Sequence, residues 1–292
     1  MKTFKDAVRQ NDFAVSAEIF LRPESDADSI RAQADILTEA VDAILLTDNR
    51  FGQVHMSTLA AASILLGMDV DPVVQLSSRQ RNRIALLSDL LGAGAIGVTS
   101  LLLIAGERVP KELEPRPKTV LDLSATDLIL TANTIKNDEK LSSRPDFFVG
   151  GIVTPLIPGP NWKPTKVLEK IDAGAQFVQT HTCMDLDVLR RYAKYLVDNK
   201  FIQRTSIIGA VAVLESAEDA TWLKEHRPNV MVPNAIIERL QNSKKPKEEG
   251  IQICAETITV LRKMPGIDGV SIMATRNLSS IPRVLRAAGL GC

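Results

Sequence analysis

The sequence predicts a single-domain α/β protein, a (β/α)8 TIM barrel, on three observations. Eight short runs rich in β-branched residues recur along the 292 residues, and most are followed by an amphipathic helical pattern. The runs are apolar through their middles rather than alternating, as in parallel strands that helices cover. The first strand-to-helix turn, IFLRPESD, lacks the glycine fingerprint of a dinucleotide-binding domain. The pattern therefore favours one barrel over two doubly wound domains.

The expected strands lie, in chain order, at residues 13–20, 41–48, 71–77, 96–106, 146–155, 175–182, 204–213 and 267–275. Helices are expected where apolar residues recur at helical spacing after possible capping residues, at 25–40, 81–94, 164–175, 186–200 and 216–226. Two segments exceed a minimal barrel, a long proline-rich loop at 107–129 and a charged surface stretch at 240–250. Long loops in compact domains are usually functional, and the first follows the end of a strand, where barrels keep their active sites.

Composition and charge narrow the class of partner. Lys plus Arg and Asp plus Glu number 35 each, so no basic excess is present to neutralise nucleic-acid phosphates. No apolar run reaches the roughly 18 to 20 residues that cross a bilayer, and the N-terminal residues lack the apolar segment of a secretion signal. We therefore expect a cytoplasmic protein that binds neither nucleic acid nor membrane.

The cysteines and histidines give no sign of a disulfide framework or a metal site. Both sets are odd in number, widely spaced and without metal-ligand spacing. They are Cys183, Cys254, Cys292, His55, His181 and His226. No metal site is expected.

Polar side chains follow the strands at their C-terminal ends. Because all strands of a parallel barrel end at one rim, residues far apart in sequence converge there. The candidate pocket residues are Glu18, Thr47, Asp48, Asn49, Gln75, Ser77, Glu107, Thr154, Thr180, His181, Thr275, Arg276 and Asn277.

Two carboxylates of this set suggest acid–base chemistry. Glu18 lies among apolar neighbours in SAEIF, and burial of a carboxyl group favours its protonated form, which suits proton transfer near neutral pH. The alternative is a carboxylate paired with a nearby arginine. Glu107 follows Ala105 and Gly106, small residues that let a planar ligand approach the backbone, and the same two alternatives apply to it.

Three other features have a structural explanation beside a functional one. His181 could be an acid, a hydrogen-bond donor or a core histidine. The arginines at 79, 81 and 83 could bind an anion or solvate the start of a helix, and the second is the default. The small residues of LLGAGAIG indicate close helix packing rather than a phosphate loop, because no Gly-Lys-Ser/Thr follows.

Five stretches in the right order resemble the methylenetetrahydrofolate reductase family, in the branch whose second strand ends in Thr-Asp-Asn. They are SAEIFLRP, LLTDNRFGQVHMS, QLSSRQRNRIALLSDLLGAGAIG, LLLIAGERVP and LEKIDAGAQFVQTHTCMD. The resemblance covers nearly the whole chain. It implies a flavin-dependent barrel that interconverts 5,10-methylene- and 5-methyltetrahydrofolate with NADH or NADPH, in one-carbon metabolism and methionine biosynthesis. It also implies a homo-oligomer.

The resemblance assigns roles to individual residues. Glu18 would be the general acid that opens the methylene bridge, and Glu107 and His181 would contact the pterin. Further substrate contacts would come from Arg276 and Asn277. The residues that would contact FAD or the nicotinamide are Thr47, Asp48, Gln75, Ser77, Gly106, Ala125 and Lys170.

The chain departs from the family pattern mainly on the cofactor side. Gln75 replaces a histidine, Glu169 replaces an arginine, and GGIVTPLIPGPN lacks a Tyr-Pro-Glu-x-His pattern that brackets FAD. Three electron supplies stay open: FAD held differently, direct hydride transfer from the nicotinamide, or an electron-transfer partner. Two other functions also stay open, a folate-binding subunit without its own flavin and a pterin-dependent methyltransferase barrel.

Overall fold

The structure is a computed structural model that describes residues 3–10, 13–110, 113–141, 144–227 and 229–290. Eight parallel strands form a closed barrel in which each strand pairs with the next and β8 pairs with β1. The strands are β1 (Ala14–Glu18), β2 (Ala43–Leu46), β3 (Pro72–Ser77), β4 (Ser100–Ile104), β5 (Phe148–Val153), β6 (Phe177–Thr180), β7 (Ser206–Val213) and β8 (Gly269–Ala274). Each lies within its expected range, so the predicted (β/α)8 barrel is confirmed.

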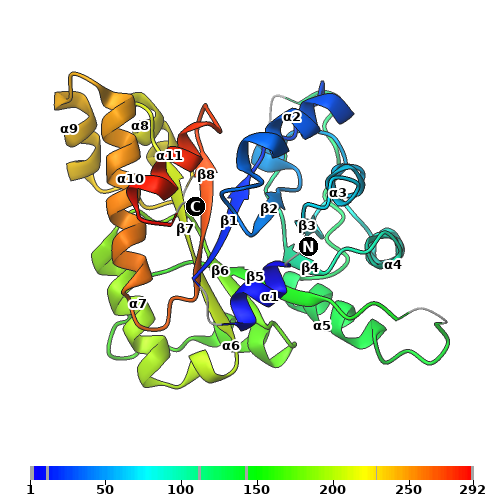
Figure 1. The fold of residues 1–292 in the computed structure, drawn as a ribbon. Helices are drawn as coiled ribbons and strands as arrows, with labels where there is room; N and C mark the ends of the chain where they lie inside the picture. Colours follow the sequence, from blue (N-terminus) through cyan, green and yellow to red (C-terminus); the bar gives the residue numbers. More distant parts are fainter. Residues whose placement is uncertain (1–2, 11–12, 111–112, 142–143, 228, 291–292) are drawn as a thin grey trace.

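Helices surround the barrel, with α2 to α4 on one side and α7 to α11 on the other (Figure 1). They are α1 (Phe4–Arg9), α2 (Ala27–Leu37), α3 (Thr58–Leu66), α4 (Arg83–Ala95), α5 (Ala125–Ile135), α6 (Thr165–Asp172), α7 (Leu186–Asp198), α8 (Ala217–His226), α9 (Asn234–Asn242), α10 (Pro246–Arg262) and α11 (Ser280–Ala287). Two 3-10 turns, η1 (Arg50–Gly52) and η2 (Phe201–Gln203), complete the elements.

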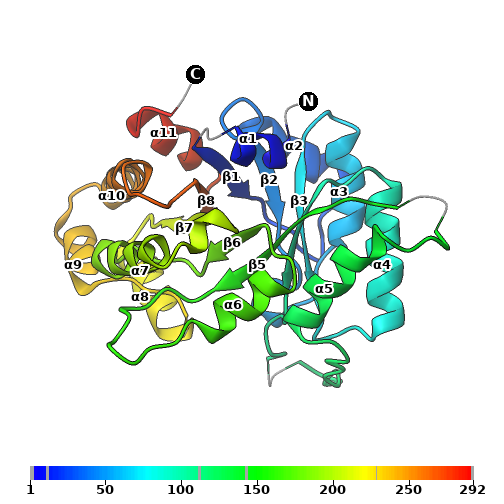
Figure 2. The same ribbon diagram turned by 90° about the horizontal axis from the view of Figure 1, so that it is seen from below.

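The structure corrects the prediction for two segments, because parts of both are helical. The segment expected to be a loop as far as residue 129 becomes helical at Ala125, because Ser124 and Asp127 form a capping box that starts α5. The loop therefore ends at residue 124, and it projects from the body on the opposite side to α1 (Figure 2). The charged stretch at 240–250 contains the end of α9 and the start of α10, which begins with Pro246 in its first turn.

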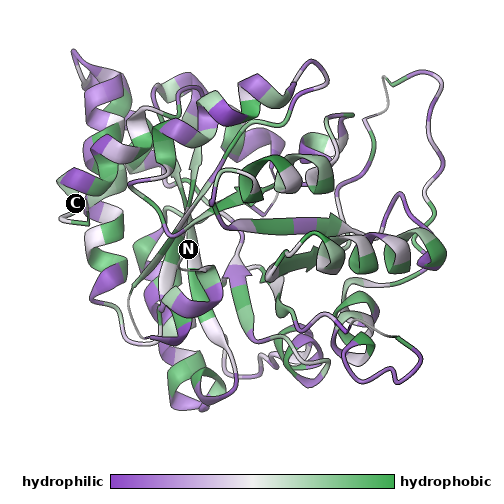
Figure 3. Cartoon of the chain, turned by 45° about the vertical axis from the view of Figure 1, so that its right-hand side comes forward, coloured by the Kyte–Doolittle hydropathy of each residue, from purple (hydrophilic) through white to green (hydrophobic). Residues whose placement is uncertain are grey.

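The strands separate two hydrophobic cores. Side chains on their outer faces pack against the helices, and the strands are accordingly hydrophobic while the helices carry polar residues outward (Figure 3). The inner core fills the barrel, where Phe148 and Phe177 stack at 5.0 Å. A Cβ atom on Gly150 would lie 2.3 Å from the Phe177 ring, so only glycine fits there.

Helix α1 closes the N-terminal end of the barrel. Its Phe4 ring meets the Phe177 ring edge-on at 5.5 Å, and the backbone N–H of Phe4 donates to the Asp71 carboxylate at 2.7 Å. Since α1 and the inner core fill this end, the polar side chains at the opposite end form the accessible rim.

Candidate active site

The C-terminal rim of the barrel collects the predicted residues from six strands. Glu18 ends β1, Ser77 ends β3, and Glu107 follows β4. The others, placed after β2, within β3, after β4, after β6 and after β8, are Thr47, Asp48, Gln75, Gly106, His181, Arg276 and Asn277. Two predicted cofactor residues lie on helices instead, Ala125 as the first residue of α5 and Lys170 in α6.

Glu18 is buried at the rim and paired with an arginine. Its side chain lies 3.2 Å from Nε of Arg50, and the residue as a whole is 7% exposed. Among the residues that the structure describes, its Oε1 atom has no directed hydrogen bond in addition to this ion pair. The position at the end of β1 agrees with a catalytic carboxylate. The ion pair with Arg50 agrees with the alternative, a carboxylate paired with a nearby arginine.

Arg50 is held by the unusual backbone of the loop that follows β2. Asn49 and Phe51 both have positive φ, 49° and 63°, in the left-handed region that non-glycine residues rarely adopt. Gly52 also has a positive φ, and a Cβ atom there would lie 2.3 Å from the carbonyl oxygen of Arg108. The loop is therefore braced against the segment that follows β4.

Arginines and aromatic rings alternate from this loop to α8. The guanidinium of Arg50 lies 5.7 Å from the Phe20 ring centroid and 4.7 Å from that of Phe51. The guanidinium of Arg227 lies 3.5 Å from the Phe51 centroid and 5.5 Å from that of Trp222. We call Phe20, Arg50, Phe51, Arg227 and Trp222 the arginine–aromatic row; such cation–π contacts contribute about 0.5 to 2 kcal/mol each.

The row connects the two predicted catalytic carboxylates. Arg227 forms an ion pair with Glu107, as Arg50 does with Glu18, and the Phe51 ring contacts both arginines. Burial lowers the pKa of Arg227 from its ordinary value, whereas Glu107 raises it. Glu18 and Glu107 thus open onto the same rim.

A second network fixes the rim between β2 and β3. The Asp48 carboxylate accepts from the Ser77 backbone N–H at 2.8 Å and from the Ser77 hydroxyl at 2.7 Å. Arg81 bonds both oxygens of Asp48 and also pairs with Asp89 at 3.0 Å. Asp48 and Ser77, which were predicted to contact a cofactor, are therefore hydrogen-bonded to each other. Of the arginines at 79, 81 and 83, it is Arg81 that stabilises this network.

The other two arginines of that group also have local partners. Arg83 bonds the Asp122 carboxylate through Nε at 3.1 Å, and Arg79 donates to the carbonyl of Gly106 at 2.9 Å. The contact from Arg79 positions the turn that precedes Glu107. These side chains hold loops together, whereas the default expectation for the group was that they solvate the start of a helix.

His181 follows β6 in a largely buried position. Burial, and then the positive charge of Lys170, lower its pKa to about 4. The imidazole is therefore neutral near pH 7, with one nitrogen as a donor and the other as an acceptor. Such a group can orient a polar ring, but it holds no proton to release as an imidazolium.

Arg276 and Asn277, the predicted substrate contacts after β8, have partners of their own. Nε and Nη2 of Arg276 donate to the Asp219 carboxylate of α8 at 2.9 and 2.8 Å, and Thr275 donates to the same group at 3.1 Å. The Asn277 side chain accepts from the backbone N–H of Ser279 at 3.0 Å. The charge of Arg276 is thus largely neutralised.

A cavity of about 410 Å³ lies beside the rim between β5, α6 and α7. Its cations are Lys163, Lys166 and Lys170, and we call it the lysine cavity. Its remaining lining comprises Ile152, Val153, Thr154, Leu156, Trp162, Pro164, Thr165, Val167 and Tyr192. No carboxylate belongs to the lining.

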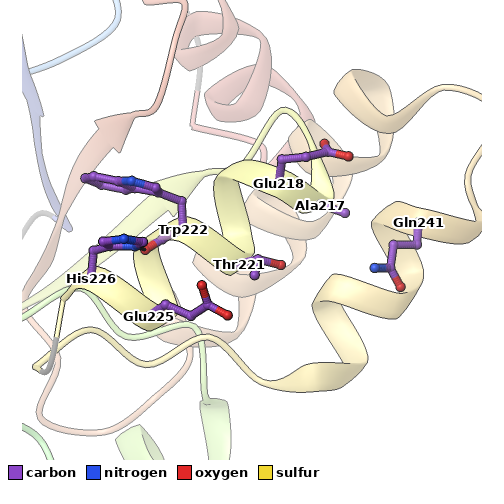
Figure 4. A pocket seen from close by; sticks show the side chains of 7 residues that line it. All are labelled: Ala217, Glu218, Thr221, Trp222, Glu225, His226 and Gln241. Atoms are coloured by element: carbon purple, nitrogen blue, oxygen red, sulfur yellow. Dashed lines mark hydrogen bonds between the residues drawn. The ribbon is translucent and has the colours of Figure 1, made fainter.

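A shallower hollow of about 280 Å³ lies between α8 and α9 (Figure 4). The Trp222 and His226 rings stack there at 5.0 Å and point away from Gln241 on α9. Glu218 and Glu225 also line this hollow. Trp222 thereby joins the outer surface to the arginine–aromatic row.

Several of these residues had no role in the sequence-based prediction. Arg50 and Phe51 stand within the quoted TDNRF stretch, but the left-handed backbone that directs them is set by tertiary contacts. Lys163 and Lys166 had no predicted role either, although their spacing of three and four residues from one another and from the predicted Lys170 is recognisable. Arg227 and Tyr192 carry no sequence signal, because only folding brings them to the rim.

No cluster of His, Cys, Asp and Glu with metal-binding geometry occurs among the described residues. Within the same residues, no helix is both long and apolar enough to span a membrane. Cys183 and Cys254 are free and buried, and Cys292 lies outside the described residues.

Comparison with known proteins identifies a family and a fold. The family model for methylenetetrahydrofolate reductase matches residues 3–289. No curated protein sequence gives a significant match. Among solved structures, an uncharacterized protein from Clostridium thermocellum that binds two copies of 5-methyl-5,6,7,8-tetrahydrofolic acid has a TM-score of 0.70 at 11% identity, with coverage of 98% of this chain and 97% of that chain.

A second solved structure marks how widely the fold is shared. Oxaloacetate acetylhydrolase, in complex with 3,3-difluorooxalacetate, has a TM-score of 0.52 at 11% identity, covering 93% of this chain and 78% of that chain. At these identities the two structures establish the barrel alone.

Proposed function

The chain belongs to the methylenetetrahydrofolate reductase family, and we propose that it binds a reduced folate at the barrel rim and interconverts its methylene and methyl forms. The observation that carries the proposal is the buried carboxylate of Glu18 at the end of β1, on the same rim as Glu107 and His181. The structural relative that binds 5-methyltetrahydrofolate supports a folate as the ligand.

Glu18 is the proton donor in this proposal. Its proton would open the five-membered ring of the methylene folate to a reactive iminium, and a general acid of this kind contributes about 10²- to 10⁴-fold in rate. In the opposite direction the same carboxylate would take the proton back. Arg50, 3.2 Å away, holds the Glu18 side chain in position in the free protein, and this ion pair would open when Glu18 carries the proton.

His181 and Glu107 orient the pterin ring. A neutral imidazole can donate one hydrogen bond and accept another, which suits the mixed donor and acceptor edge of a pterin. Glu107 presents a carboxylate whose charge is balanced by Arg227, so it can accept from ring N–H groups without leaving a bare charge at the rim. The reaction would therefore take place between these two groups and Glu18.

FAD is the cofactor that the family implies, and the rim fits its ring better than its phosphates. Thr47, Gln75 and Gly106 provide uncharged contacts between β2 and β4. On that side Arg81 and Arg83 are paired with carboxylates, whereas the Arg79 side chain bonds, among the described residues, only the carbonyl of Gly106, so Arg79 and Lys170 are the cations that could meet the phosphates. When bound, FAD would relay a hydride from NADH or NADPH to the folate.

A folate-binding subunit without its own flavin is the second candidate. The observation in its favour is that Asp48 and Ser77, two of the predicted cofactor contacts, are occupied by each other and by Arg81. The visible absorption spectrum of the purified protein separates the candidates, since a bound flavin colours the protein yellow.

The activity test replaces Glu18 with Gln. We expect Glu18→Gln to reduce folate-dependent oxidation of NADH or NADPH by about 10²- to 10⁴-fold, because the amide cannot supply the proton. Folate affinity should change by less than a few-fold. The measurement is steady-state kinetics with a parallel binding titration.

The matched control is Glu238→Gln on the exposed face of α9, which should leave both quantities unchanged. Full turnover in Glu18→Gln would remove Glu18 as the donor. A wild-type protein that binds folate but shows no folate-dependent turnover in either direction would favour the binding subunit.

A further inference from the structure

Phe51, at the centre of the arginine–aromatic row, has a strained backbone. Its φ of 63° lies in the left-handed region, which bulky residues rarely adopt. Its ring contacts the guanidinium of Arg50 from the same loop, and the side chains of Arg227 and Trp222 from α8 and its C-terminal end. Strain of this kind persists only where the surroundings hold it, and it is concentrated at functional sites. The strain therefore points to a role for the ring in the function of the rim.

Arg50, which the Phe51 ring contacts, has two kinds of partner. Its Nε atom lies 3.2 Å from Oε1 of Glu18, and its guanidinium carbon lies 5.7 and 4.7 Å from the ring centroids of Phe20 and Phe51. The attraction to Glu18 requires that Glu18 is a carboxylate. The attraction to the faces of the two rings does not, because it comes from the charge distribution of the rings. The rings can therefore keep the guanidinium beside Glu18 when Glu18 is neutral.

Glu18 changes its charge during the proposed reaction, on which this inference rests. It is a neutral acid before it gives its proton to the folate and a carboxylate afterwards. The carboxylate forms at a residue that is only 7% exposed, where water can stabilise a new charge only weakly. A guanidinium that is already in place stabilises the charge as it develops and needs no rearrangement at that moment. The position of Arg50 while Glu18 is neutral therefore affects the rate.

Arg227 fixes the Phe51 ring from outside the loop. Its guanidinium carbon lies 3.5 Å from the ring centroid, which is van der Waals contact, and its ion pair with Glu107 holds it there. The Arg227 side chain is 17% exposed, and its Nε atom has no hydrogen-bond partner among the residues that the structure describes. The ring is therefore held by a side chain that is itself anchored, and its orientation toward Arg50 does not depend on the loop alone.

We propose that Phe51 is a positioning residue that keeps the Arg50 guanidinium beside Glu18 throughout the reaction. Its ring, together with that of Phe20, holds the cation during the part of the cycle in which Glu18 is neutral. The cation is then in place when the carboxylate forms. Phe51 acts through Arg50 and not through contact with the folate, so loss of its ring slows turnover and leaves folate affinity unchanged.

The experiment is a double-mutant cycle on kcat for folate-dependent oxidation of NADH or NADPH by the full chain. Phe51→Leu and Arg50→Gln should each lower kcat by about tenfold, the size of a cation–π contact in a site with little water. The double variant should be no slower than Arg50→Gln alone, because the ring then has no cation to position. Independent effects, which multiply to about a hundredfold, would overturn the inference.

Two further variants separate the role of the ring from a general effect on the loop. Phe51→Tyr keeps an aromatic face and should restore kcat to within about twofold of wild type. Phe20→Leu removes the other ring without altering the strained loop, and it should lower kcat as Phe51→Leu does. The dissociation constant for 5-methyltetrahydrofolate should stay within about twofold of wild type in Phe51→Leu. Weaker folate binding with unchanged kcat would show that the ring contacts the ligand, against the inference.

Val54→Ala is the matched control, because Val54 lies in the same loop, is 62% exposed and is outside the arginine–aromatic row. It should keep the wild-type kcat, and a loss equal to that of Phe51→Leu would count against the inference. Normal turnover in both the wild type and Phe51→Leu would overturn the inference and leave the proposed function standing. Absence of folate-dependent turnover by the wild type in either direction would overturn both.

Discussion

At the scale of single residues, burial sets the chemistry of the titratable groups. His181 at the rim is kept neutral by burial and by Lys170, and burial raises the pKa of the Cys183 thiol to about 12. At the opposite end of the barrel, burial raises the pKa of Asp71 to about 6, although hydrogen bonds from Phe4 and Thr99 oppose the shift. Burial therefore shifts the pKa values of titratable groups at both ends of the barrel.

Asp71 should make the stability of the protein depend on pH. A carboxyl whose pKa is about 6 in the folded state and about 3.9 in the unfolded state contributes stability below pH 4, and this contribution is lost as the pH rises through 6. Asp71→Asn, which keeps an acceptor for the Phe4 N–H, should flatten the dependence of Tm on pH between 4 and 7. Thermal unfolding followed by circular dichroism measures it, and an unchanged pH profile would contradict the assignment.

At the scale of elements, short segments far from the rim hold it in place. Helix α1 is only six residues long, yet its Phe4 is part of the inner core together with Phe148 and Phe177. The loop after β2 is braced by contacts with Arg108 and with α8. Element position therefore depends on partners that are distant in the chain.

Loss of the Phe4 side chain should destabilise the protein strongly. We expect Phe4→Ala to lower the free energy of unfolding by about 3 to 5 kcal/mol, because it leaves a cavity between α1 and the barrel interior. Urea unfolding measures the change. Ile84→Ala, at a side chain 72% exposed on α4, is the control and should cost less than about 0.5 kcal/mol. Equal effects at the two positions would show that α1 does not close the barrel.

At the scale of the whole molecule, the barrel brings separated charges together and leaves little net charge. Glu18, Glu107 and His181 span more than 160 positions in the sequence but share one rim because the strands are parallel. Positive and negative charges are equal in number over the chain. The chemistry therefore depends on local pairing rather than on an overall field.

The balanced charge predicts a solubility minimum near neutral pH. With a sequence pI of about 6.8, mutual repulsion between molecules is weakest close to pH 7. Precipitation by polyethylene glycol should need less polymer at pH 6.8 than at pH 8.5. Equal thresholds at the two values would indicate that surface pairing, not net charge, controls association.

The pattern of apolar runs was sufficient to predict the fold. All eight strands lie within their expected ranges, since parallel buried strands leave a continuous apolar signal that local sequence carries. Helices α1 and α9 were not expected, although α6, which is also short, was. The residues at the strand ends followed from the topology, and so did their shared rim.

The sequence by itself determined the barrel, its polar rim and the family resemblance, because these depend on local periodicity and on short ordered motifs. Only the tertiary structure decided which charged side chains form ion pairs: Arg50 with Glu18, Arg227 with Glu107, and Asp219 with Arg276. It also decided that three lysines would share a cavity with the Tyr192 hydroxyl. The reason is that a charge pair depends on distance in space, which residues from different strands and helices acquire only when the barrel closes.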